Sequence, residues 1–276
     1  MEFKYVDCNL CGENNFDILQ NSDPYKLVKC KKCGLIYINP QPEESSLAAN
    51  YDQGYFTPWL TKQISVRRKM WKRRLKKIQP FKNTGRLLDV GCGTGQFLNE
   101  AKNNGWRVWG TEVSEYALNY AKDEFCIEVF KGKLENANFP ENFFDVVTFW
   151  HVLEHTTDPL GNLIEARRIL RRSGIMVIAV PNVKNYIYKI AYMIVKLRRP
   201  RIFTSLNDRE IHLYHFSTDT LKKMLEKAGL IPIKFDIDKE RAFLWERILD
   251  ISAWALYKIL KVNFGIAFEV YAKKIK

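Results

Sequence analysis

Short apolar runs alternate with longer segments whose apolar residues recur at helical spacing along most of the chain beyond residue 83. Apolar runs within 87–90, 143–149 and 175–180 are typical of strands that are buried on both faces of a sheet. Weaker strand patterns occupy 106–112, 126–130, 231–237 and 266–273. Seven strands separated by helices predict an α/β fold with a mostly parallel, seven-stranded sheet and helices on both faces.

The segments between the strands carry helix signals. Apolar residues lie along one face of a helix over 61–79, which is otherwise strongly basic. We expect a helix over 163–170 that ends in basic residues and a C-capping glycine, Gly174. A shorter helix is predicted within 43–56, followed by a turn at Gly54.

The first 33 residues hold two Cys-x-x-Cys pairs: Cys8, Cys11, Cys30 and Cys33. Two residues between thiols allow one tight turn to present both sulfurs to one metal ion, and this spacing is typical of zinc sites. Four thiolates complete a tetrahedral shell, so the zinc would be structural. Two disulfides are the alternative, which a cytoplasmic location disfavours. We interpret the segment as a zinc ribbon.

Three glycines at alternate positions, Gly91, Gly93 and Gly95, follow the strand over 87–90 and precede a helical pattern. A strand, a glycine turn and a helix in this order bring backbone close to a nucleotide at the carboxyl end of the strand. The spacing is not that of a dinucleotide fingerprint, which places its third glycine one position later. A glycine-rich turn that binds nothing is the alternative.

Glu112 ends the next predicted strand, 17 positions after Gly95. A carboxylate at this place can accept hydrogen bonds from both ribose hydroxyls of a bound nucleoside. The helix that follows has Ser114 as its predicted N-cap. A solvated carboxylate at a strand end is the alternative interpretation of Glu112.

Asp89 and the glycine turn resemble motif I of class I S-adenosylmethionine-dependent methyltransferases. The cysteine ribbon, the turn and the segments 151–158 and 212–217 follow one another as in a bacterial subgroup of that family. The resemblance covers 1–235, and proteins of the subgroup are often associated with methylation of sugars or glycan precursors. It implies a Rossmann-like fold, S-adenosylmethionine as methyl donor and a small-molecule, sugar or lipid-linked glycan acceptor.

The resemblance also implies cofactor contacts. They fall on Asp89, Gly91, Cys92, Gly93, Gly95, Glu112, Leu134 and Trp150. At the place where the family usually has an acidic or polar side chain for the adenine amino group, this chain has Lys133. That departure leaves recognition of the adenine to backbone near Leu134 or to another side chain.

Methyl transfer to oxygen or carbon requires loss of a proton, and histidine is suited to accept it. His155 is the first candidate base, with Glu154 to orient it, and His151 and His212 are the second candidates. Structural histidines at a strand end are the alternative. The spacing from His151 to His155 also matches an inverted zinc-protease motif, which we reject because it begins where a strand ends and Pro159 follows closely.

The net charge of +13 is unevenly distributed, since 62–82 holds ten basic residues and no acidic one. This density favours an anionic partner, such as RNA, a phosphorylated small molecule or an anionic membrane surface, although a solvated helix face would look the same. The span 183–205 is both apolar and basic, which predicts a lid over the substrate or an interfacial membrane anchor.

We divide the chain into a zinc ribbon (1–42), a linker with a basic helix (43–82) and a methyltransferase domain (83–276) with a helical lid at about 183–215. No signal peptide opens the chain and no run reaches 18 apolar residues, so we expect a cytoplasmic protein that can contact the inner face of the membrane. Two other functions are considered. One is an RNA methyltransferase that uses the ribbon and basic helix as its RNA platform, and the other is a non-catalytic, cofactor-binding scaffold.

Overall fold

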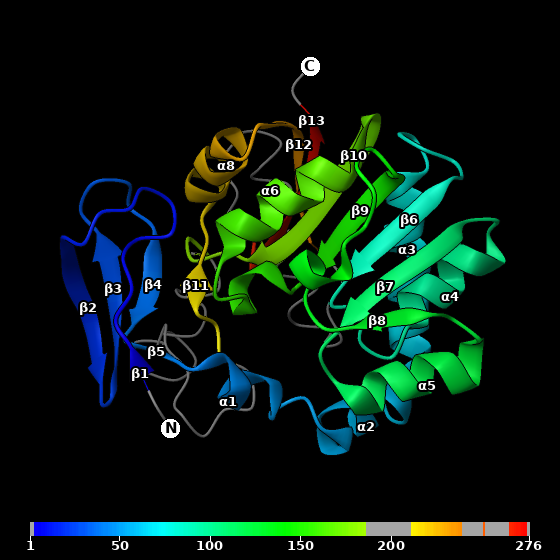
Figure 1. Cartoon of the computed structure of the whole chain (residues 1–276), viewed down its shortest axis with the longest axis horizontal. Coiled ribbons are helices and arrows are strands. Elements are labelled where there is room, and N and C mark those ends of the chain that lie inside the picture. Colours follow the sequence, from blue (N-terminus) through cyan, green and yellow to red (C-terminus); the bar gives the residue numbers. More distant parts are fainter. Residues whose placement is uncertain (1–2, 186–210, 239–250, 252–264, 275–276) are drawn as a thin grey trace.

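The computed structural model describes residues 3–185, 211–238, 251 and 265–274. A seven-stranded sheet forms its centre, as predicted, in the order β12-β13-β10-β9-β6-β7-β8 (Figure 1). The strands are β6 (Arg86–Val90), β7 (Arg107–Glu112), β8 (Val129–Lys131), β9 (Phe144–Trp150), β10 (Leu170–Pro181), β12 (Leu230–Ile237) and β13 (Ala267–Lys274). Pairs from β10 to β8 are parallel, whereas β13 is antiparallel to both of its neighbours.

Helices cover both faces of this sheet (Figure 1). They are α3 (Ile64–Ile78), α4 (Gln96–Asn103), α5 (Glu115–Phe125), α6 (Pro159–Ile169) and α8 (Thr218–Lys227). In the view of Figure 1, α6 and α8 lie in front of the sheet, and α3 and α4 lie behind it. Ser217 caps α8 with a reciprocal capping box, and Ser114 caps α5 as predicted.

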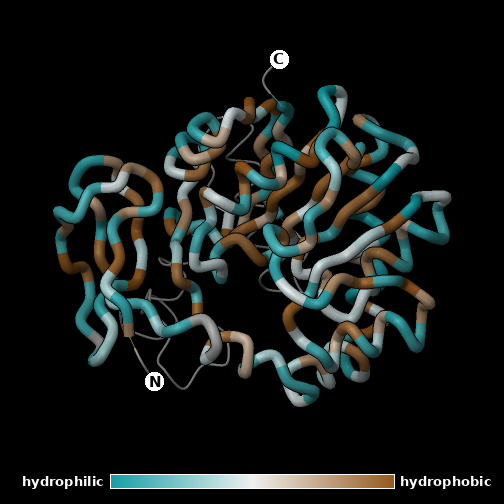
Figure 2. Tube along the Cα trace, viewed as in Figure 1, coloured by the Kyte–Doolittle hydropathy of each residue, from teal (hydrophilic) through white to brown (hydrophobic). Residues whose placement is uncertain are grey.

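The central strands are hydrophobic on both faces because each face is buried in a separate core. Leu88 and Val90 of β6 belong to a core with α6, α8 and the N-terminal segment, whereas Leu87 belongs to a core with Trp71 of α3 and Leu98 of α4. Figure 2 shows hydrophobic stretches on the central strands and hydrophilic ones on outer turns. Consecutive apolar residues therefore indicated double-sided burial correctly.

The N-terminal segment forms a separate small sheet, whose fourth strand comes from far along the chain. The sheet has the order β11-β4-β3-β2, from β2 (Phe16–Ser22), β3 (Tyr25–Cys30), β4 (Ile36–Asn39) and β11 (Tyr214–His215). Two short strands, β1 (Phe3–Lys4) and β5 (Gln41–Pro42), pair beside it. The antiparallel pairing of β11 with β4 joins the cysteine segment directly to the larger domain.

Two predicted helix ends differ from the structure. Gly54 lies inside α2 (Gln53–Leu60) rather than in a turn, because the Asp52 side chain accepts a hydrogen bond from the Tyr55 amide and starts the helix earlier. A preceding helix, α1, spans Glu44–Ala48. Gly174 lies within β10 and is not a C-cap, since the chain becomes extended at Leu170, directly after α6.

The strand predicted over 126–130 begins only at Val129, because Cys126 ends α5 in a left-handed conformation with φ of 50°. Most of the predicted lid over 183–205 lies outside the described residues, as do nearly all of residues 240–262, for which the tryptophan-rich sequence also predicts helix. Among those that are described, no helix has both the length and the hydrophobicity that crossing a membrane requires.

Candidate functional site

A cavity of about 200 Å³ lies at the carboxyl ends of β6, β7 and β9, where the chain order of the parallel strands reverses. The turn after β6, the end of β7 and the residues after β9 contribute to its lining, together with α1, α2 and α3. Open α/β sheets bind ligands at this kind of position. The location agrees with the position expected from the glycine turn.

The glycine turn brings backbone to the cavity wall without side chains. Gly91 has a φ of 64°, and a Cβ there would lie 2.7 Å from Cγ2 of Val152. Gly95 acts differently, because it lies outside the cavity lining and its Cβ would lie 2.8 Å from Cβ of Ala121 in α5. Gly91 and Gly93 line the cavity, whereas Gly95 permits close packing of α4 against α5.

Glu112 holds the turn and the end of β7 together. Its Oε2 accepts a hydrogen bond from the Gly93 amide at 2.7 Å, and its Oε1 accepts from the amides of Val113 and Ser114 at 2.8 and 2.9 Å. Burial raises the pKa of the Glu112 carboxyl, although the three amide donors favour its charged form. Because each carboxylate oxygen has two lone pairs, Oε2 can still accept from a ligand in the cavity.

Asp89, the last acidic residue before the turn, is buried at the end of β6 and lines the same cavity. Its Oδ1 accepts a hydrogen bond of 2.6 Å from the Thr148 hydroxyl. Burial raises the pKa of this carboxyl to about 8, against the lowering effects of Thr148 and Arg74.

An aromatic wall from the α1–α2 segment closes the cavity over the glycine turn. It consists of Tyr51, Tyr55, Phe56 and Trp59, and a Cβ on Gly93 would lie 3.4 Å from the Phe56 ring. The guanidinium of Arg67 lies 3.7 Å from the centre of the Trp59 ring and places a cation in the lining. The sequence-based prediction missed these residues, although four aromatic residues within nine positions gave a usable signal.

At the end of β9, His151 belongs to a buried ionic network. Its Nε2 lies 2.9 Å from Oδ2 of Asp238, which also accepts a hydrogen bond of 2.7 Å from Arg74. Burial lowers the pKa of the His151 imidazole, but the carboxylates of Asp238 and Glu154 raise it by more. His151 also has a φ of 58°, an unusual conformation for a residue that is not glycine. The network was not predicted, because its members are distant in sequence.

The short 3₁₀ helix η2 (Leu153–His155) follows and carries the first candidate base. Nδ1 of His155 lies 3.0 Å from the Ile211 carbonyl and donates to it, which leaves the lone pair on Nε2. His212 lies beside it, with ring centres 4.8 Å apart. Burial raises the pKa of the Glu154 carboxyl, but His151, His155 and His212 lower it by more.

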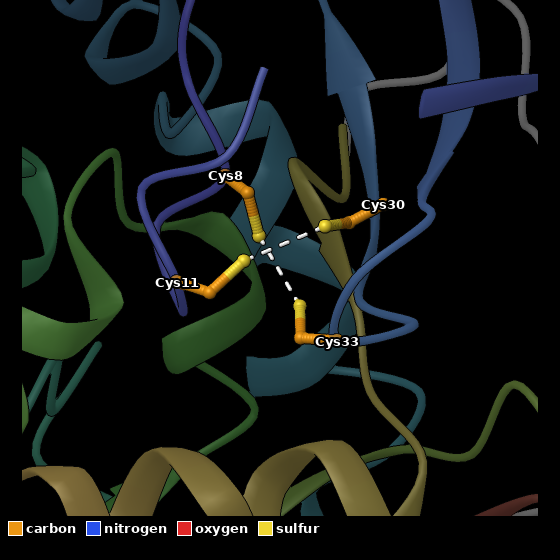
Figure 3. A group of neighbouring side chains, drawn as sticks. All are labelled: Cys8, Cys11, Cys30 and Cys33. Carbon is orange, nitrogen blue, oxygen red and sulfur yellow. Dashed lines mark hydrogen bonds between the residues drawn. The ribbon is translucent and has the colours of Figure 1, made fainter. Parts of the chain in front are cut away.

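The four N-terminal cysteines converge on one point (Figure 3). Sγ of Cys8 lies 3.4 Å from Sγ of Cys33, Cys11 and Cys30 are 3.5 Å apart, and none of the four forms a disulfide. A tetrahedral zinc ion with bonds of about 2.3 Å separates its sulfur ligands by about 3.8 Å, so the cluster needs little rearrangement to fit zinc. Burial raises the pKa of the Cys33 thiol to about 11, and metal coordination would remove that proton.

Most of the predicted site residues meet in the cavity. Its lining includes Asp89, Gly91, Cys92, Gly93, Glu112, Leu134, Trp150, His151 and His155. Glu154, Gly95 and His212 are not in the lining. Lys133 lies in the lining, and its Nζ is 3.6 Å from Oε1 of Glu135. The residue that departs from the family pattern is therefore at the cavity.

The known proteins that this chain resembles are methyltransferases. A family model described as a methyltransferase domain matches residues 64–234. The demethylmenaquinone methyltransferase of Staphylococcus saprophyticus is 28% identical to this chain over 60% of the chain and 78% of that protein. The ubiquinone/menaquinone biosynthesis C-methyltransferase UbiE of Paraburkholderia phymatum is 30% identical over 54% of this chain and 69% of its own.

Solved structures show the same fold at low sequence identity. Magnesium protoporphyrin IX methyltransferase ChlM from Synechocystis, with bound SAH, has a TM-score of 0.58 at 12% identity and covers 84% of this chain and 100% of its own. A SAM-dependent methyltransferase from Archaeoglobus fulgidus has a TM-score of 0.53 at 22% identity, with coverages of 81% and 100%.

Proposed function

This chain belongs to the methyltransferase domain family, and from that membership we propose that it transfers the methyl group of S-adenosylmethionine to a small-molecule acceptor. The observation that carries the proposal is that one cavity is lined by Glu112 and by His155. Glu112 ends β7 and His155 lies in η2, which follows β9, and these two strands flank β6 in the sheet. A residue suited to bind a ribose and a residue suited to accept a proton therefore line the same cavity.

The chain's own residues suit the methyl donor. Glu112 would accept hydrogen bonds from the ribose, and the glycine turn would let backbone approach the nucleoside. Arg67 provides a cation for the carboxylate of the donor's methionine part. Backbone near Leu134 is our candidate for the adenine, since Lys133 has no acceptor to offer its amino group.

The reaction is an in-line displacement on the sulfonium methyl group. The acceptor's O–H or C–H bond loses its proton, the acceptor atom forms a bond to the methyl carbon, and the C–S bond breaks to leave a neutral thioether. Positioning of the two reactants can supply roughly 7–11 kcal/mol of the barrier reduction. His155 is the residue on which we place activation of the acceptor, because it lines the cavity and its Nδ1 donates to the Ile211 carbonyl, which leaves Nε2 as the acceptor in the neutral ring.

For the acceptor we propose a sugar or a lipid-linked glycan precursor. Helix α3 lines the cavity through Arg67 and Trp71 and exposes five cationic side chains: Arg68, Lys69, Lys72, Arg73 and Lys76. A cationic surface next to an aromatic-walled cavity suits an acceptor that is carried on a phosphate-bearing lipid. The names of the relatives, which refer to quinone precursors, also favour a small-molecule acceptor.

The same basic surface favours one alternative acceptor, RNA. Transfer of labelled methyl from S-adenosylmethionine into fractionated extracts separates the two. We expect label in a ribonuclease-resistant, small-molecule or lipid-linked fraction. Ribonuclease-sensitive label would instead establish an RNA acceptor, and cofactor binding with no transfer to any fraction would favour a scaffold.

The cysteine cluster supports a further part of the proposal, a structural zinc ion bound by Cys8, Cys11, Cys30 and Cys33. Four thiolates would leave no coordination position for water or substrate. The zinc would therefore stabilise the small sheet of β11, β4, β3 and β2 and take no part in the chemistry.

A further inference from the structure

Glu154 is a buried carboxylate whose cationic neighbours among the described residues are imidazoles at 3.5 Å or more. Its side chain is 1% exposed, and neither oxygen accepts a hydrogen bond from the residues that the structure describes. The nearest cationic candidate is the His151 imidazole, whose Nδ1 lies 3.5 Å from Oε1 of Glu154 and whose Nε2 is bonded to Asp238, so its charge is shared between two carboxylates. A buried charge in this situation is costly unless a further positive group neutralises it.

Two more metal-ligating side chains surround the same carboxylate. Nε2 of His155 lies 4.0 Å from Oε1 of Glu154, and the bond from Nδ1 to the Ile211 carbonyl makes Nε2 an acceptor. In the neutral ring, Nε2 and Oε1 are both acceptor atoms, and a cation between them would satisfy both. His212 completes the group, and a donor atom from each of the three residues lies within 4.8 Å of the others.

We infer that Glu154, His155 and His212 bind a divalent first-row transition metal ion at the edge of the cofactor cavity. Two imidazoles and one carboxylate are a donor set that such ions accept while keeping other coordination positions open. Bonds of about 2.0–2.2 Å bring donor atoms to about 3–3.6 Å from one another, so side-chain adjustments of about 1 Å suffice. This site differs from the closed cysteine site in that His155 reaches the cavity.

This inference rests on the proposed function and specifies how His155 acts. The ion would hold an acceptor hydroxyl and lower its pKa, with His155 as ligand rather than direct base. The hydroxyl proton passes to water, the oxygen attacks the methyl carbon, and the C–S bond breaks to leave the neutral thioether. With more than one open position, the ion would favour an acceptor with hydroxyls on adjacent carbons, as sugars have.

Equilibrium dialysis against Co²⁺ tests the site without a turnover measurement. The full chain is first dialysed free of loosely bound metal, and elemental analysis verifies that zinc is retained. We expect the zinc-loaded protein to bind one further cobalt ion per chain, because the thiolate site is already filled. Failure of folded, zinc-loaded protein to bind cobalt would overturn the inference.

Variants locate the ion. Glu154→Gln and His212→Ala should each lower cobalt affinity by at least about tenfold. His215→Ala is the matched control, since His215 lies in the same segment, 6.0 Å from the His212 ring, and is absent from the three-residue group. Unchanged affinity in both ligand variants, or an equal loss in the control, would contradict the assignment.

Methyl transfer separates this inference from the proposed function. Metal-depleted, zinc-loaded enzyme should bind S-adenosylmethionine normally and regain at least about tenfold in turnover when Co²⁺ is added. Full transfer without added metal would overturn the metal site and leave the methyltransferase intact. Absence of S-adenosylmethionine binding by the folded chain would overturn the proposed function, whereas the cobalt measurement would still stand.

Discussion

The Ile38 amide, in strand β4 of the N-terminal sheet, donates a hydrogen bond of 2.9 Å to the carbonyl of Leu213. The amide of Leu213 in turn donates to the carbonyl of Glu154 at 2.8 Å. A second link runs through Asn9, whose side chain accepts from the Leu160 amide and donates to Asp158. The cysteine segment is therefore part of the frame that holds η2 and the start of α6.

Loss of the cysteine site should impair turnover more than cofactor binding. In Cys11→Ser we expect zinc content to fall and turnover to drop by about a hundredfold, because a shift of about 1 Å at η2 misplaces the reacting groups. Cys126→Ser is the control, since Cys126 is exposed and outside the cluster. Elemental analysis, steady-state rates and S-adenosylmethionine titration provide the readouts. Normal turnover in zinc-free protein would contradict the link.

A side chain on the glycine turn should exclude the cofactor. Gly93→Arg would direct a long side chain toward Phe56 and Trp59, and we expect affinity for S-adenosylmethionine to fall by at least about a hundredfold, or about 2.8 kcal/mol. Zinc content should not change. Gly105 also has a positive φ, but a side chain there would meet open space, so Gly105→Arg controls for backbone strain. Calorimetric titration would refute the prediction if Gly93→Arg bound the cofactor tightly.

The central sheet could be predicted because its signal is local. Doubly buried strands read as continuous apolar runs, and the turn after β6 requires glycine at positions that sequence alone displays. Helix ends were less predictable, since an Asp52 cap moved the start of α2 and tertiary pairing of Leu170 began β10 early. Local residue preferences do not show which of two possible helix ends a side-chain cap or a strand pairing will select.

The site was predictable where its residues follow strand ends and less so where distant segments meet. Glu112 and His155, predicted from their positions at or after strand ends and from the family resemblance, both line the cavity, and their roles stay predictions. The bond between Arg74 and Asp238 joins residues 164 positions apart, and no periodicity encodes it. The same holds for β11, two residues long, which completes a sheet begun almost 200 positions earlier.

Arg67 should contribute to binding of the donor and little to the chemical step. Arg67→Met keeps much of the apolar stem but removes the charge, and we expect KM for S-adenosylmethionine to rise about tenfold with kcat nearly unchanged. Arg68→Met, on the exposed neighbouring position, serves as the control. A fall in kcat at constant KM would instead place Arg67 near the acceptor.

His155→Ala should separate binding from turnover. Cofactor affinity should stay within about twofold, because none of the hydrogen bonds of Glu112 or the glycine turn involves His155. Turnover should fall by at least about a hundredfold, because His155 activates the acceptor, either as a base or as a ligand of the inferred metal ion. Labelled-methyl transfer and cofactor titration on the same preparation provide both values, and unaltered turnover would remove His155 from the reaction.

The buried carboxyl of Asp89 should make the stability of the ligand-free protein depend on pH. Its pKa is about 8 when folded and about 3.9 in an unfolded chain, so between these values the folded state holds the extra proton. The stabilisation is fully present below about pH 4 and is lost as pH rises to about 8, at about 1.4 kcal/mol per pH unit. Asp89→Asn remains neutral, so its unfolding free energy should fall less steeply over this window. Denaturant unfolding at pH 5, 6, 7 and 8 gives the slope of the unfolding free energy against pH for the wild type and for Asp89→Asn. Asp123→Asn, at an exposed position, is the control. Equal slopes for Asp89→Asn and the wild type would show that the Asp89 carboxyl is ionised in the folded protein.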